Sequence, residues 1–171
     1  MKTLYLFLDF DGVLNNANED FGRDELDRLN QSNLDQFDIL INKLKENFEI
    51  KIVINSAWKM NIFKGRENWL DLFINRIKPL IKYRQYIIDT TPTYRFWQKG
   101  YDCKRFEVEA WVAQQLYDGN DAEFLILDDE LIKNKGCMEF IKIYRTDCNI
   151  GLTNIDVDNI CDMLIGDINE Q

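Results

Sequence analysis

The sequence predicts an α/β fold in which a five-stranded, mostly parallel sheet forms the middle of three layers. Short apolar runs without polar alternation recur along the chain, and such runs are typical of strands that are buried on both faces. Segments with apolar residues at helical spacing separate these runs, as expected when helices connect parallel strands. The length of 171 residues and the hydrophobic content of 46% fit one Rossmann-like domain over residues 1–171.

The N-terminal half contains three predicted strands, at residues 4–8, 50–54 and 86–88. Ser32 can cap a helix after the first strand, because apolar residues recur at helical spacing beyond it, namely Leu34, Phe37, Leu40, Ile41 and Leu44. A second helix is predicted over about residues 58–77, either continuous or broken near Gly65, with one apolar face formed by Trp69, Leu72, Phe73 and Ile77.

The C-terminal half continues the alternation of helix and strand. A helix over residues 104–117 is predicted to turn four apolar side chains inward, those of Val108, Trp111, Val112 and Leu116. Apolar strands follow at residues 124–127 and 140–144, and Thr153 with Asp156 forms a capping-box pattern before a last helix. Each strand ends in polar residues, which we expect at one edge of the sheet.

Two carboxylates, Asp9 and Asp11, follow the first strand directly and precede Gly12. Side chains two residues apart along an extended chain point the same way, so both carboxylates can converge at the edge where parallel α/β sheets bind ligands. Carboxylates at such a distance repel one another unless a cation or a proton lies between them. The alternative is an Asp-rich turn in which Gly12 supplies a positive φ.

The net charge of the chain is −9, so its surface as a whole is not expected to attract polyanions. Residues 78–105 differ, because seven basic and two acidic residues give them a charge of +5 and leave −14 for the rest. The sequence therefore predicts one positive edge. Within it, residues 94–99 combine aromatic and basic side chains, which can either bind nucleic-acid bases and phosphates or fold back onto the domain.

The chain contains no histidine, so Ser-His and Cys-His nucleophile pairs are excluded and proton transfer falls to carboxylates, lysine, tyrosine or water. Its four cysteines lack CxxC spacing, which argues against structural zinc and favours reduced, mostly buried thiols. The sequence enters the first strand without a leader pattern, and no apolar run has the length of a membrane span. We therefore expect a cytoplasmic protein that does not associate with membranes.

Four short motifs resemble those of the haloacid dehalogenase (HAD) superfamily. They occur in the same order as in that superfamily and at the same positions, namely strand ends and helix starts. They are Asp9-Phe10-Asp11-Gly12-Val13-Leu14, Ser56, Lys104 and Asp128-Asp129. Finer features resemble the HAD domains of Swiss Army Knife RNA repair-like proteins, namely Ser56-Ala57-Trp58-Lys59, Thr91-Pro92, Lys104-x-x-Glu107-Val108-x-x-Trp111, Leu127-Asp128-Asp129, Thr146-Asp147 and Gly151-Leu152-Thr153. Where that pattern often has arginine this chain has Lys104, which cannot bind phosphate with a bidentate fork.

The resemblance implies a phosphatase whose catalytic residues are Asp9 and Asp11. Asp9 would attack phosphorus to form an aspartyl-phosphate, and Asp11 would protonate the leaving oxygen and later deprotonate the hydrolytic water. The phosphate of the substrate would be bound by Ser56, Ala57 and Lys104, which offer a hydroxyl, a backbone N–H and a fixed positive charge.

The resemblance also implies Mg²⁺ as cofactor, held by the oxygen ligands that this ion prefers. The residues that would hold it are Asp9, Asp11 through its backbone carbonyl, Asp128 and Asp129. One of Asp128 and Asp129 would be the direct ligand and the other would orient it.

Each of these residues also has a purely structural explanation. Ser56 could cap a helix, Lys104 could be a solvated lysine, and the acidic triplet 128–130 could cap a helical turn. Glu107, near a helix start, is explained by the helix dipole without any role in chemistry.

Three functions stay open on the sequence alone. The spacing between the motifs leaves no room for a cap module, so the site is predicted to be open and to accept a large phosphorylated substrate, such as an RNA or DNA end. A nucleotidase or small-molecule phosphatase that closes its site by oligomerisation is the second possibility. A non-catalytic binding module of a repair complex is the third, and the complete set of acidic motifs argues against it.

Overall fold

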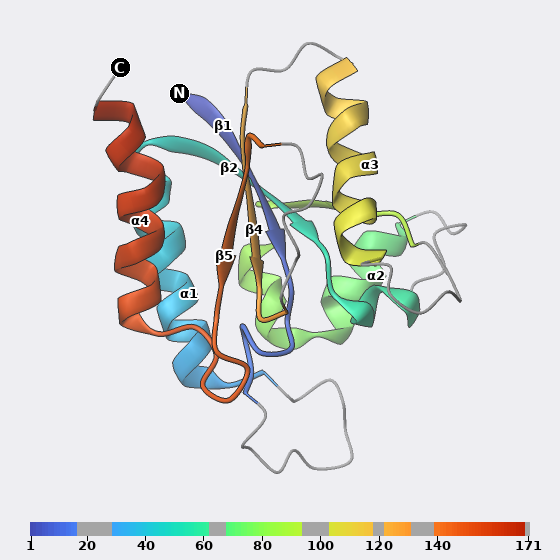
Figure 1. Ribbon diagram of the computed structural model, residues 1–171. Coiled ribbons are helices and arrows are strands. Elements are labelled where there is room, and N and C mark those ends of the chain that lie inside the picture. Colours follow the sequence, from blue (N-terminus) through green and yellow to red (C-terminus); the bar gives the residue numbers. More distant parts are fainter. Residues whose placement is uncertain (17–28, 62–67, 94–102, 118–121, 131–138, 170–171) are drawn as a thin grey trace.

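The computed structural model describes residues 1–16, 29–61, 68–93, 103–117, 122–130 and 139–169, and it confirms the predicted alternation of strands and helices (Figure 1). Its elements are β1 (Lys2–Leu8), α1 (Gln31–Leu44), β2 (Phe48–Ile54), the 3₁₀ segment η2 (Ala57–Asn61), α2 (Trp69–Arg76), the 3₁₀ segment η3 (Lys78–Tyr83), β3 (Ile87–Thr90), α3 (Cys103–Tyr117), β4 (Ala122–Asp128), β5 (Ile141–Arg145) and α4 (Asn154–Asn169).

All five strands are parallel, in the order β3-β2-β1-β4-β5, which confirms the predicted fold class. From the central β1 the chain first builds the β2–β3 side of the sheet and then the β4–β5 side. The boundary between β1 and β4 is therefore the switch point of the sheet. Open α/β sheets bind their ligands outside the carboxyl ends of the strands at such a point.

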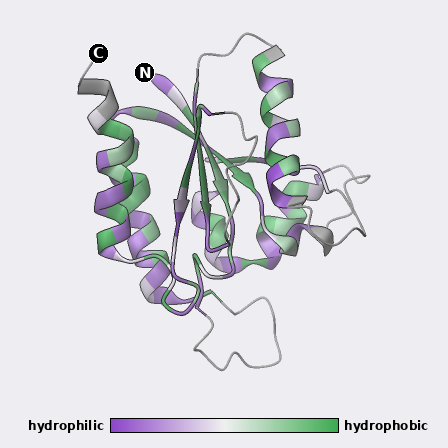
Figure 2. Cartoon of the chain, in the orientation of Figure 1, coloured by the Kyte–Doolittle hydropathy of each residue, from purple (hydrophilic) through white to green (hydrophobic). Residues whose placement is uncertain are grey.

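Helices cover the sheet on both faces, as the three-layered prediction requires. Leu4, Leu6 and Leu8 of β1 pack in one buried cluster with α1, η3 and α4, whereas Tyr5 and Phe7 pack in a second cluster with α3. Figure 2 shows mostly apolar strands between helices that carry both apolar and polar residues. Burial of a large apolar side chain contributes about 1.5–3 kcal/mol, so these two clusters hold the strand ends in place.

Helix α1 begins two residues earlier than its predicted cap would allow. The cap is Asn30 rather than Ser32, and its side chain accepts a hydrogen bond from the Asn33 backbone N–H at 3.1 Å. Asparagine caps helices as well as serine does, so either polar residue could have started this helix. The capping box of α4 is confirmed, because the Thr153 backbone N–H donates to Asp156 Oδ2 at 2.8 Å.

The predicted helix over residues 58–77 is wrong in its extent. In the described part of this range, residues 58–61 belong to η2 and the α-helix α2 covers only Trp69–Arg76, with η3 beginning at Lys78. Trp69 is half-buried and Leu72 is exposed, so neither belongs to the core as predicted. Leu116 is also exposed, because it lies in the last turn of α3, and periodicity does not indicate how far the sheet extends beneath a helix.

Among the cysteines whose side chains are described, Cys161 is buried as predicted and Cys148 is exposed. No helix within the described ranges combines the length and apolar character that crossing a membrane requires. Residues 94–99 and residues 17–28, in the connection between β1 and α1, lie outside the described residues. The expectations of a nucleic-acid-binding segment and of a site without a cap therefore stay predictions.

Candidate active site

Four polar residues lie level with one another at the carboxyl edge of the sheet, at the ends of four neighbouring strands. The registers of β1 with β2 and with β4 put Asp9 beside Asn55 on one side and beside Asp128 on the other. Thr91, directly after β3, follows Asn55 in the row. The Asp9 backbone N–H donates to the Leu127 carbonyl at 3.1 Å, so backbone hydrogen bonds fix the spacing of the two carboxylates.

The alternation of side chains along the strands decides which face of the sheet this row joins. Tyr5 and Phe7 lie in the cluster under α3, so Asp9, in the same phase of β1, points to the α3 side. Asp128 shares its phase with Phe124, which belongs to the same cluster. Because α3 begins at residue 103, Lys104 in its first turn reaches this edge from above the row.

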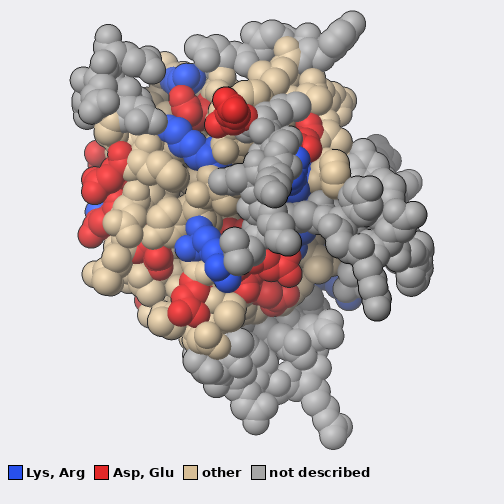
Figure 3. All heavy atoms as spheres, in the orientation of Figure 1, with Lys and Arg blue, Asp and Glu red and all other residues tan. Residues whose placement is uncertain are grey.

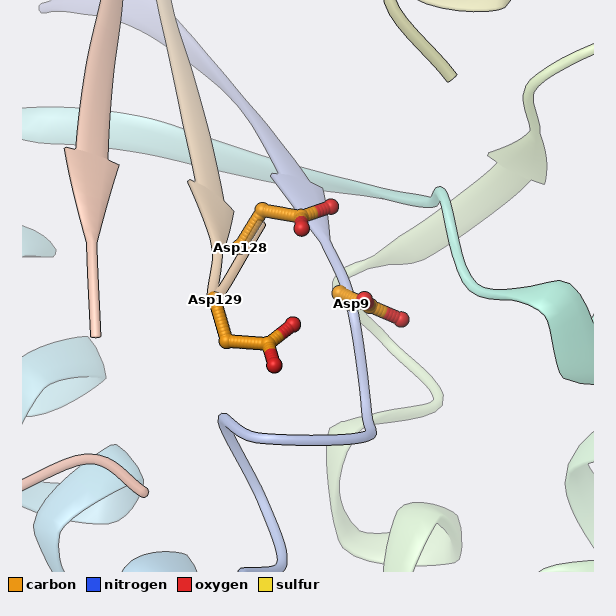
Figure 4. Close-up of side chains that lie close together, drawn as sticks. All are labelled: Asp9, Asp128 and Asp129. Atoms are coloured by element: carbon orange, nitrogen blue, oxygen red, sulfur yellow. The ribbon is translucent and has the colours of Figure 1, made fainter. Parts of the chain in front are cut away.

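Three carboxylates meet at this point, those of Asp9, Asp128 and Asp129 (Figure 4). They offer oxygen atoms that all lie within 4.8 Å of one another, and the side chains of Asp9 and Asp128 are buried. Lys104 Nζ lies 2.5 Å from Asp9 Oδ2 and 3.2 Å from Asp128 Oδ2. The strand ends and the lysine that the sequence singled out are thus assembled into one cluster.

Burial makes this cluster electrostatically unusual. Desolvation raises the pKa of Asp9 above its ordinary value, although the nearby Lys104 ammonium lowers it. Burial and the negative charge of Asp9 raise the pKa of Asp128 to about 7, and the same two causes raise the pKa of Asp129. Burial lowers the pKa of Lys104, but Asp9 and Asp128 more than offset this and raise it, so this lysine stays protonated. One ammonium group thus faces three carboxylates.

The loop after β1 is shaped so that Asp129 can approach it. Gly12 has a φ of 69°, and a Cβ atom at this position would lie 2.3 Å from Asp129 Cγ. Thr146, at the end of β5, donates a hydrogen bond from its hydroxyl to the Gly12 carbonyl at 2.7 Å. Only glycine combines this backbone conformation with this approach, so Gly12 allows the third carboxylate to join the cluster.

Asp11 is not part of the group of three carboxylates. The strand ends at Leu8 and the chain turns before Asp11, so the alternation that holds within β1 does not continue to it. Its carboxylate accepts hydrogen bonds from Asn15 Nδ2 at 2.8 Å and from Trp58 Nε1 at 2.9 Å. The predicted catalytic role of Asp11 and the predicted use of its carbonyl as a metal ligand stay predictions.

The predicted phosphate-binding serine is buried beside Asp9. A hydrogen bond from the Ser56 side chain lowers the pKa of Asp9, and the Ser56 hydroxyl oxygen accepts the Trp58 backbone N–H at 3.3 Å. Ala57 is exposed and begins η2, which takes the place of the longer helix predicted here. Ser56 therefore lies next to the nucleophile candidate, and Ala57 is its immediate neighbour at the start of a short 3₁₀ segment.

Sequence reasoning missed a second buried cluster behind Ser56. Lys59 Nζ donates to Glu107 Oε2 at 2.5 Å and also to the Thr91 hydroxyl, and the Thr91 hydroxyl donates to Asn55 Oδ1 at 2.8 Å. The side chains of Lys59 and Glu107 are only 3% and 6% exposed. A signal was present, because Glu107 lies one helical turn after Lys104 on the face that carries the other inward residues of α3.

Asn55 has one further feature that bears on the site. Its side chain is fully buried, and its Nδ2 atom has no hydrogen-bond partner among the described residues. Buried N–H groups in folded proteins are nearly always satisfied, so an acceptor from a ligand fits this position. Asn55 is level with Asp9 and in the same phase, which makes a phosphate oxygen a suitable acceptor.

The predicted positive edge is largely compensated in the described part of residues 78–105. Acidic side chains neutralise three of its cations, in the pairs Lys82–Asp38, Arg84–Asp71 and Arg105–Glu109. Lys104 is bound within the carboxylate cluster. On the face seen in Figure 3, described basic and acidic side chains lie interspersed. The local charge excess therefore does not by itself indicate a nucleic-acid surface.

Comparison with protein families gives one match, to the model described as the HAD domain in Swiss Army Knife RNA repair proteins. The match covers residues 5–157, from the first strand to the first turn of the last helix, and so includes every residue of the cluster. The comparisons with curated proteins and with solved structures found no match.

Proposed function

Because the chain belongs to the family of HAD domains in Swiss Army Knife RNA repair proteins, we propose that it is a Mg²⁺-dependent phosphomonoesterase that works through an aspartyl-phosphate on Asp9. One observation carries the proposal. Asp9 is buried at the switch point of the sheet, with Ser56 and Lys104 bound to its carboxylate and two further carboxylates beside it. Membership in a family of HAD domains suggests a phosphohydrolase. The cluster supports this because it offers a carboxylate nucleophile, an ammonium group and a hydroxyl for phosphoryl transfer.

The reaction is divided into two displacements at phosphorus. Asp9 attacks the phosphoryl group and the bond to the leaving alkoxide breaks, while Asp11 gives a proton to the departing oxygen. Asp11 then takes a proton from water, which displaces Asp9 and releases inorganic phosphate. Lys104 balances the charge of the nucleophile and of the phosphoryl oxygens, and Ser56, with the Ala57 N–H, binds those oxygens.

The donor set fits a divalent cation. Asp9, Asp128 and Asp129 present carboxylate oxygens within 4.8 Å of one another. Burial raises the pKa of all three, and the negative charge of Asp9 further raises the pKa of Asp128 and of Asp129. Hard oxygen ligands of this kind suit Mg²⁺, and the carbonyl of Asp11 is proposed as a further ligand. When bound, the ion neutralises charge so that an anionic nucleophile and an anionic phosphoryl group can approach one another.

For the substrate we propose a phosphorylated nucleic-acid end, for instance a terminal 3′ phosphate. The description of the family, which places such domains in RNA repair proteins, supports this choice. The paired cations of residues 78–105 give it little support. The proposal for the substrate therefore depends on the family and on the predicted openness of the site.

The experiment measures phosphate release from oligonucleotides with a 3′ or a 5′ phosphate and from the mononucleotide with the same terminal base. We expect release from an oligonucleotide end in Mg²⁺, none in EDTA, and none from the isosteric Asp9→Asn variant. A preference for the mononucleotide would exclude a polynucleotide phosphatase and favour a nucleotidase. Equal rates for the natural chain and Asp9→Asn would rule out Asp9 as the nucleophile.

A further inference from the structure

The carboxylate of Asp11 is exposed, yet both of its oxygen atoms are bound by protein groups. Asn15 Nδ2 donates to Oδ1 at 2.8 Å, and Trp58 Nε1 donates to Oδ2 at 2.9 Å. An exposed carboxylate without such partners samples several rotamers. One donor on each oxygen instead fixes both the direction of the side chain and the plane of its carboxyl group.

Both donors are themselves held in place. The Trp58 ring packs edge-to-face on Phe10, with ring centroids 5.3 Å apart and an interplanar angle of 85°, and its backbone N–H donates to Ser56 Oγ at 3.3 Å. Asn15 is buried, and its Oδ1 accepts the Gly12 backbone N–H at 2.9 Å. The indole therefore joins the Ser56 turn to the loop that carries Asp11.

We propose that Trp58 is a positioning residue that holds the Asp11 carboxyl group for proton transfer to the leaving oxygen, an inference that rests on the proposed phosphatase function. Each carboxylate oxygen has two acceptor positions, so accepting one N–H leaves a second position free on each oxygen. In the first displacement, the proton on Asp11 moves to the leaving oxygen as the bond from that oxygen to phosphorus breaks and the bond to Asp9 forms. The two N–H donors stay bound throughout, so the carboxyl group does not reorient.

This role predicts a dependence on the leaving group that a merely structural role does not produce. An alkyl phosphate such as glycerol 2-phosphate needs a proton on its departing oxygen, whereas 4-nitrophenolate leaves without one. We use kcat/KM because it covers the steps up to departure of the alcohol and excludes the later hydrolysis. For Trp58→Phe, which keeps an aromatic ring against Phe10, we expect kcat/KM to fall about tenfold for glycerol 2-phosphate and less than about threefold for 4-nitrophenyl phosphate.

Trp111→Phe is a matched control. It removes another indole N–H that donates to a carboxylate at 2.9 Å, but the acceptor is Asp89, which takes no part in the site. We expect its effect on kcat/KM to be the same for both esters. Thermal unfolding of both variants shows whether either has lost its fold, and an Asp11→Asn background shows whether Trp58 acts through Asp11.

In that background, adding Trp58→Phe is expected to change kcat/KM for glycerol 2-phosphate by less than about twofold, because the proton donor is already absent. Equal losses on both esters for folded Trp58→Phe would overturn the inference, as would additive losses in the double variant. If the natural chain releases phosphate neither from these esters nor from a phosphorylated oligonucleotide end in Mg²⁺, the proposed function itself is refuted, and the inference falls with it.

Discussion

Two lysines bind carboxylates at the carboxyl edge of the sheet, but the number of carboxylates around each lysine differs. Lys59 is buried against one carboxylate, that of Glu107, and against the Thr91 hydroxyl. Lys104 is partly exposed and faces the carboxylates of Asp9 and Asp128 directly, with Asp129 in the same cluster. Within the described residues, the first arrangement pairs one ammonium with one carboxylate. The second places three clustered carboxylates beside one ammonium, with Glu130 Oε2 3.5 Å from Lys104 Nζ, so negative charge is in excess.

This difference separates a cluster to which we assign a structural role from the proposed active site beside it. The buried pair of Lys59 and Glu107 ties the η2 segment to the first turns of α3. Carboxylates in excess of nearby cations destabilise the folded protein unless another group neutralises them. Such an excess of charge is common in ligand sites. We therefore expect substitutions in the two clusters to have opposite effects, with activity lost in one and stability lost in the other.

The largest effect is expected for Asp9→Asn. Loss of the nucleophile should lower turnover of 4-nitrophenyl phosphate about 10⁴-fold or more, since acceleration by a covalent nucleophile is lost entirely. The metal-free variant should unfold at the same temperature as the natural chain or higher, because one of three mutually repelling carboxylates is gone. Asp158→Asn, in an exposed surface pair with Lys43, is the control for charge and should change neither property.

Lys59→Met should mainly reduce stability. Removing one partner of a buried ion pair typically lowers the free energy of unfolding by about 3–5 kcal/mol, because a buried charge is left behind. Denaturant unfolding of Lys59→Met and of the double variant Lys59→Met/Glu107→Leu measures this. The double variant should regain most of the loss, since apolar replacements of both partners are often neutral. A stable single variant would contradict the structural role of the pair.

Mg²⁺ should stabilise the protein through the acidic cluster alone. At about 100 times its Kd, a ligand that binds only the folded state adds about 2.7 kcal/mol, or about 5–10 °C in Tm for a chain of this length. Asp129→Asn should lose most of this shift, and Lys59→Met should keep it although it unfolds at a lower temperature. An equal shift in all three proteins would place the cation elsewhere.

Much of the fold could be predicted from the sequence because it depends on strong, local patterns. Unbroken apolar strands and helical spacing identified the five parallel strands and the helices α1, α3 and α4. The extent of the helix after β2 could not be predicted in this way. Residues 58–77 are compatible with one helix, but in the described part of this range packing gives η2 and a short α2. Phe73 faces inward as predicted, whereas Ile74 takes the inward position expected of Leu72.

The site was predictable where the sheet itself builds it. Strand ends of a parallel sheet share one edge, so the order of strands and polar residues along the chain was enough to place Asp9, Ser56 and Asp128 together. The contacts of Asp11 could not be placed, because they form after the chain leaves β1 and depend on a turn around Gly12. The partner of Lys59 was hidden for a similar reason, since pairing between η2 and α3 is a property of packing.

The smallest expected effect is a dependence of stability on pH that only the acidic cluster produces. The pKa of Asp128 is raised to about 7 in the folded protein, by burial and by Asp9, from 3.8. The folded state therefore binds more protons than the unfolded state between these values, and stability falls as the pH rises through 7. Between pH 6 and pH 8 the free energy of unfolding of the metal-free protein should fall by about 1 kcal/mol, as measured by urea unfolding in EDTA. With no histidine in the chain, few other groups titrate in this window.

Saturating Mg²⁺ should remove this dependence of stability on pH because it keeps the carboxylates ionised, and Asp128→Asn should remove it without metal. A slope that persists in Asp128→Asn would assign the titration to another group.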